Sequence, residues 1–182
     1  MNFYHFPRFE SLREMIEDAP VVPLEIVLSS AEVFNTLEQS FDIVNARSYY
    51  MSTLAKRHNP AAAAAALARV DAEFLKYALE ASLMRTEIDK MALEIDMPAP
   101  VRVQAKALLL PIATPLSRRF VALIEDADVT AGVVEGLTIS ERISSAERAA
   151  FFGFFGSRIS GLRRTIDSEW KSLFDAEEAR GS

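Results

Sequence analysis

Residues 97–119, MPAPVRVQAKALLLPIATPLSRR, decide the fold that we expect for this chain. From Val101 to Ala107, valine and alanine alternate with polar residues, which is the period of a half-buried strand. Pro98 and Pro100 favour an extended backbone for the residues before them. We therefore predict a strand over 101–107, with its valines and alanines against a helical core. A helix is the alternative, because Val101, Leu108 and other apolar residues also fall at helical spacing.

The polar side of the predicted strand carries Arg102, Gln104 and Lys106. Arginine and lysine bond guanine, glutamine bonds adenine, and a two-stranded ribbon fits the major groove of DNA. These three residues are therefore candidates for reading base edges. They lie in an acid-free window, 97–124, that also holds Arg118 and Arg119, and a second such window covers 148–166.

A second strand is expected over 22–29, where Leu24, Ile26 and Leu28 alternate with other residues after Pro23. A helix from about 30 to 57 follows, started by Ser29 or by Ser30. Ser29 and Glu32 have the spacing of a capping box.

The dipeptide Asn59-Pro60 begins another helix, over 60–96, with apolar residues three and four apart throughout. The short link predicts that this helix and the previous one fold back as a long antiparallel hairpin. The strand 22–29 then leads into one end of the hairpin, and the strand 101–107 leaves from that same end. The two strands therefore run in opposite directions. We expect them to pair as an antiparallel ribbon.

Two more helices are expected, over 115–134 and 144–174, the second started by a capping box between Ser144 and Glu147. Its run FFGFFG, at 151–156, is interpreted as core, with Gly153 and Gly156 allowing close helix approach. The fold class is thus mainly α, with a long helical hairpin, further helices and a small two-stranded β-ribbon. We divide the chain into an N-terminal arm (1–20), one domain (21–176) built of two β-α-α units (22–96 and 101–176), and a disordered tail (177–182).

Composition argues against several classes of function. There is no cysteine, which excludes disulfides and thiolate metal sites, and no apolar run reaches the ~20 residues of a membrane span. We expect a soluble cytoplasmic protein without metal or cofactor, since His5 and His58 have no partner at ligand spacing. No catalytic motif occurs, so we do not expect an enzyme. The acidic group Glu125, Asp126 and Asp128 is interpreted as a solvated helix face.

The net charge of −6 opposes binding to nucleic acid, because neutralisation of phosphates dominates such binding. It favours the alternative hypothesis of a helical adaptor or scaffold that docks a protein and binds no DNA. The acid-free windows favour DNA. A homo-oligomer fits both hypotheses.

The second half of the chain also resembles a known family. The residues that carry the resemblance are PVRVQAKALLLPIATPLSRRFVALIEDADV (100–129) and GLTISERISSAERAAFFGFFGSRISGLRR (136–164). They resemble the AcaB-like family of integrating conjugative elements and large conjugative plasmids. The resemblance implies a ribbon-helix-helix-like transcriptional regulator that binds double-stranded DNA and controls transfer genes. It implies base reading for Arg102, Gln104 and Lys106, and phosphate contacts for Arg118 and Arg119.

Overall fold

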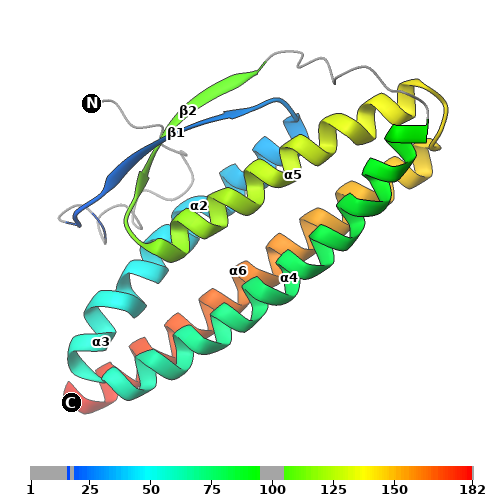
Figure 1. Cartoon of the computed structure of the whole chain (residues 1–182). Coiled ribbons are helices and arrows are strands. Elements are labelled where there is room, and N and C mark those ends of the chain that lie inside the picture. Colours follow the sequence, from blue (N-terminus) through cyan, green and yellow to red (C-terminus); the bar gives the residue numbers. More distant parts are fainter. Residues whose placement is uncertain (1–15, 17–18, 95–104, 182) are drawn as a thin grey trace.

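The structure is a computed structural model that describes residues 16, 19–94 and 105–181. In chain order the elements are β1 (Val22–Leu28), α2 (Ala31–Tyr49), the π-helical turn η1 (Tyr50–Leu54), α3 (Ala55–His58), α4 (Pro60–Glu94), β2 (Lys106–Ile112), α5 (Pro115–Ile139) and α6 (Ser145–Gly181). The long helices α2, α4, α5 and α6 form a bundle, and the ribbon lies along the side made by α2 and α5 (Figure 1). The predicted class, mainly α with a small ribbon, is confirmed. Within the described residues, no helix is long and apolar enough to span a membrane.

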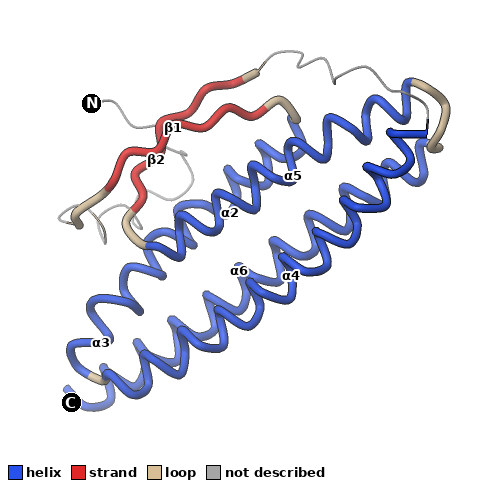
Figure 2. Tube along the Cα trace, in the orientation of Figure 1, coloured by secondary structure: helices blue, strands red, loops and turns tan. Residues whose placement is uncertain are grey.

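The two strands pair antiparallel, as predicted, in a register that is symmetric about the pair Glu25–Leu109. Figure 2 shows them lying together outside the helices. Alternation directs the even-numbered side chains from Leu24 onward toward the bundle, and the most deeply buried are Ile26, Leu28, Leu108, Leu110 and Ile112. A bare two-stranded ribbon is marginal in water, so this apolar face holds it in place.

The second strand lies further along the chain than predicted. It covers Lys106–Ile112 instead of 101–107, and residues 101–104 are outside the described part. The exposed Ala105 and Ala107 show that the inward face is the opposite one to our prediction. The physical reason is that Leu108, Leu110 and Ile112 bury far more apolar area than alanines do. Pro111 is tolerated because both strands of such a ribbon are edge strands, and its register partner is Pro23.

Packing of the first two long helices also differs from the prediction. α2 and α4 run antiparallel, but they are diagonal in the bundle, and each packs on α5 and α6 instead of on the other. The predicted apolar face of α4 is nevertheless its inner face, since Val70, Phe74, Tyr77 and Ile88 are buried. Periodicity therefore identified the buried face of α4 correctly. The helices that cover this face, α5 and α6, belong to the second half of the chain.

Helix α6 begins as predicted, with reciprocal bonds between Ser144 and Glu147. The Ser144 amide donates to a Glu147 carboxylate oxygen at 2.7 Å, and the Glu147 amide donates to the Ser144 hydroxyl at 3.2 Å. The helix continues to Gly181, through most of the predicted disordered tail. Glu177 holds this end against the bundle, because it accepts a hydrogen bond from the Tyr50 hydroxyl and lies 3.5 Å from His58 Nε2.

The FFGFFG run belongs to the core, as interpreted: Phe151 and Phe155 are buried against the other helices. The role given to its glycines is wrong. A Cβ added at Gly153 or Gly156 would meet no atom within 4 Å, so neither glycine is needed for close approach.

Replacing Gly153 with alanine should therefore stabilise the protein. The residue is exposed in the middle of a helix, and alanine restricts the unfolded chain without any clash. We expect Gly153→Ala to raise the free energy of unfolding by about 0.5–1 kcal/mol. Urea denaturation measures it, with Ala149→Gly, at another exposed α6 position, as the matched control of opposite sign.

Candidate nucleic-acid interface

The ribbon is held to the bundle at both junctions between a strand and the following helix. At the first junction, the Asp128 carboxylate from α5 accepts hydrogen bonds from the backbone amides of Ser29, at 2.9 and 3.0 Å, and Ser30, at 2.7 Å. Asp128 is only 5% exposed, so it is not part of a solvated face as predicted. A carboxylate at this place also interacts favourably with the positive end of the α2 dipole.

The second junction is held in the same manner by the first half of the chain. Asn45 of α2, fully buried, donates from Nδ2 to the Pro111 carbonyl at 2.7 Å and accepts at Oδ1 from the Ala113 amide at 3.0 Å. Each β-α unit thus has its junction fixed by a helix of the other unit. The ribbon and the bundle are coupled as one structure.

The caps of α2 and α5 repeat this symmetry. Ser30 Oγ accepts from the Val33 amide at 3.3 Å, and Thr114 Oγ1 accepts from the Ser117 amide at 3.0 Å. Ser30, and not Ser29, is therefore the cap of α2, and the capping box predicted between Ser29 and Glu32 does not form. The Ser29 amide is directed to Asp128 instead.

The outward side of the described ribbon is short of positive charge. By alternation its positions are Pro23, Glu25, Val27, Ala107, Leu109 and Pro111, of which Leu109 is half-buried and Pro111 is buried. Its one charged residue, Glu25, is exposed at the centre of the ribbon register. Sequence reasoning missed this position, although the strict alternation after Pro23 already places Glu25 opposite the buried leucines.

The structure places three of the five predicted DNA-binding residues, while Arg102 and Gln104 lie outside the described part. Lys106 begins β2 on the inward-facing side, with Nζ 3.7 Å from the centre of the Phe34 ring. This cation–π contact holds the ammonium against α2, yet the residue remains exposed. Lys106 therefore does not point away from the bundle as the predicted base-reading face requires.

Arg118 and Arg119 lie in the first turns of α5, beyond the other end of β2. Lys106 begins β2 and contacts Phe34, whereas the two arginines follow the other end of the strand and pair with acidic residues, so the structure does not bring the three cations together. Arg118 lies 3.2 Å from Glu125, and Arg119 pairs with Asp71 and sits 4.8 Å from the Phe74 ring centre. Both side chains are about half exposed.

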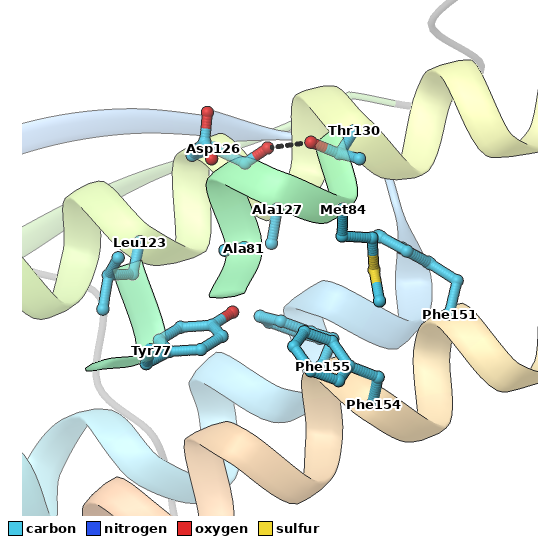
Figure 3. A pocket seen from close by; sticks show the side chains of 10 residues that line it. All are labelled: Tyr77, Ala81, Met84, Leu123, Asp126, Ala127, Thr130, Phe151, Phe154 and Phe155. Atoms are coloured by element: carbon cyan, nitrogen blue, oxygen red, sulfur yellow. Dashed lines mark hydrogen bonds between the residues drawn. The ribbon is translucent and has the colours of Figure 1, made fainter. Parts of the chain in front are cut away.

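A small cavity lies between α4, α5 and α6. Figure 3 shows its lining, which is largely aromatic and apolar: Tyr77, Ala81, Met84, Leu123, Asp126, Ala127, Thr130, Phe151, Phe154 and Phe155. Its free volume of about 20 Å³ has room for little more than one water molecule. Burial, and secondly the charge of Asp126, raise the pKa of Tyr77, so its phenol stays neutral. Among the described residues, no three histidine or acidic side chains gather as metal ligands.

Comparison with known proteins matches this architecture to a solved structure. The crystal structure of selenomethionine-containing AcaB from uropathogenic E. coli superposes with a TM-score of 0.81, over 90% of this chain and 86% of that one. The two sequences are 17% identical over the match. No family model and no curated protein matches the sequence. The chain therefore has the AcaB fold, in agreement with the family that its second half resembles.

Proposed function

We propose that this protein is a DNA-binding transcriptional regulator of a conjugative or mobile element, with its ribbon inserted in the major groove. The observation that carries the proposal is the antiparallel pair β1–β2, which lies outside the helices and is anchored at both ends. A ribbon of two strands fits the major groove of B-DNA. We propose a transcriptional regulator instead of another class of DNA-binding protein because the chain has the AcaB fold and its second half resembles the AcaB-like family in sequence.

The five predicted residues take separate roles in this proposal. Arg102 and Gln104, which precede β2, are assigned to base edges. Lys106, Arg118 and Arg119 are assigned to phosphates, because they lie at the two ends of β2, where a ribbon in the groove approaches the DNA backbone.

Fluorescence polarisation against mixed duplexes at two salt concentrations tests the proposal. Binding should weaken steeply as salt rises, and Arg118→Ala or Arg119→Ala should each lower the salt slope by about one. The double variant Arg102→Ala/Gln104→Ala should lose about tenfold or more in affinity for a preferred duplex. Lys171→Ala, which removes an exposed cation from α6, is the matched control and should change little. Equal binding by all these variants would contradict the assignment.

Glu25 offers a test of the ribbon itself. A carboxylate at the centre of the outward face is repelled by phosphates when the ribbon enters a groove. Glu25→Gln should therefore tighten binding to mixed duplexes by about three- to tenfold at low salt, measured by the same polarisation assay. Glu38→Gln, on α2, removes the same charge away from the ribbon and serves as control. No gain for Glu25→Gln would place the DNA on another face.

A helical adaptor without nucleic-acid binding is the second candidate function. It is favoured by the net charge of −6 and by the exposed leucines of α4, Leu75, Leu79 and Leu83. Absence of salt-dependent duplex binding by the wild-type chain would select this function over the first.

A further inference from the structure

The outer face of α4 carries a second row of uncharged residues, mostly alanine and leucine, separate from the apolar row that packs in the bundle. Its members recur three and four residues apart and are Ala61, Ala65, Ala68, Ala72, Leu75, Leu79, Ser82 and Thr86, and all are exposed. We call these eight residues the outer seam. None of them is charged, and the 3-4 spacing is that of a helix that packs lengthwise on another helix.

The leucines on this side are unusually exposed for a folded chain. Leu75 is 66% exposed, Leu79 is 63% exposed and the adjacent Leu83 is 62% exposed. The opposite side of α4 is already used, since Val70, Phe74 and Tyr77 are buried on α5 and α6. No described element packs over the outer seam, and a continuous apolar patch of this kind marks an interaction surface.

We propose that the outer seam is the interface of a homodimer, in which α4 packs antiparallel on α4 of a second copy. A two-fold axis at the level of residue 77 puts Leu75 of each chain against the partner's Leu79. The same axis puts Ala72 against the partner's Ser82, and Ala68 against the partner's Thr86. Leucines then meet at the centre and small residues at both ends, so the two helices approach closely along ~27 Å of α4.

Charges beside the seam are complementary under the same axis. On the side next to α5, Asp71 lies six residues before the level of the axis and Arg85 eight residues after it, so each Asp71 comes near the partner's Arg85. Within one chain Asp71 pairs with Arg119, and Arg85 pairs with Asp126. The dimer therefore joins these pairs into a row of alternating sign.

On the other side of the seam, Lys76 faces the partner's Lys76 near the axis. Glu73 lies one turn before Lys76 on the same helix and compensates this contact, whereas Glu80, one turn after it, pairs with Arg158 of α6. The self-complementary arrangement is the reason for choosing a second copy as the occupant over an unrelated partner.

Sedimentation equilibrium of the full chain over the micromolar range, without DNA, tests the proposal. The average molecular mass of the wild-type protein should rise with concentration from that of one chain toward that of two chains. Leu79→Lys should raise the dissociation constant by at least about a hundredfold, since each dimer loses two central leucines and buries two charges. Ile139→Lys, at an 83% exposed position outside the seam, should dimerise normally. A wild-type chain that stays monomeric throughout overturns the proposal.

The antiparallel direction has its own test, because the chain contains no cysteine. In the proposed dimer, Ala78 lies next to the partner's Ala78, whereas the two copies of Ala64 are ~40 Å apart. A short bismaleimide should therefore cross-link Ala78→Cys into a dimer and leave Ala64→Cys uncross-linked. Equal cross-linking at both positions overturns the arrangement. Both readouts are independent of DNA, so they can fail or succeed separately from the proposed function.

Discussion

Asp128→Ala is expected to lower the free energy of unfolding by about 3–4 kcal/mol, because it leaves the backbone amides of Ser29 and Ser30 without their acceptor. Hydrogen bonds to a charged acceptor contribute about 1.5–3 kcal/mol each, and an unsatisfied buried donor costs about 1–3 kcal/mol. The change also removes a negative charge from the start of α2. Chemical denaturation followed by circular dichroism gives the value.

Two further variants make this result specific. Asp128→Asn should cost less than the alanine variant, since one amide oxygen can still accept from these amides. Asp126→Ala removes a half-exposed carboxylate from the same helix, where it pairs with Arg85, and should cost under ~1 kcal/mol. If Asp128→Ala and Asp126→Ala cost the same, the carboxylate is not what holds the first junction.

Asn45→Asp is the second substitution with a large expected effect, about 3–5 kcal/mol at neutral pH. Asn45 both donates to the Pro111 carbonyl and accepts from the Ala113 amide, and it is completely buried. An ionised aspartate keeps the acceptor, loses the donor and places a charge against a carbonyl oxygen.

The penalty of Asn45→Asp should also depend on pH. A protonated aspartic acid can donate to Pro111, so the folded state favours the neutral form and the pKa of the new group is raised by burial. The variant should be nearest to wild type at acid pH and lose stability as pH rises toward neutrality. Urea titrations at several pH values measure this, with Asn35→Asp at an exposed α2 position as control. A pH-independent penalty would show that the donor is not the important group.

Both substitutions act on the same structural principle, which is reciprocal support between the two β-α-α units. Asp128 of the second unit fixes the start of α2, and Asn45 of the first fixes the start of α5. Since these residues anchor both ends of the ribbon, we expect either substitution to weaken the DNA binding proposed above, because it disturbs the orientation of the strands.

Much of the local structure was readable from the chain because it depends on residues that are close in sequence. The 3-4 spacing of Val70, Phe74 and Tyr77 predicted the inner face of α4, and Ser144 with Glu147 predicted the start of α6. Alternation of Leu24, Ile26 and Leu28 predicted β1 and its buried side. Capping and periodicity are short-range effects, so they act in the same way before any tertiary contact forms.

Only the tertiary structure decided which apolar surfaces meet and which polar groups they enclose. The second strand settled on Leu108, Leu110 and Ile112 because these side chains fill the space over the bundle better than those of 101–107. That choice put Lys106 against Phe34. Asp128 was read as a surface acid because its partners, the amides of Ser29 and Ser30, are distant in sequence. A sequence pattern indicates how strongly a residue favours burial. Which residues it then contacts depends on packing energies summed over the whole fold.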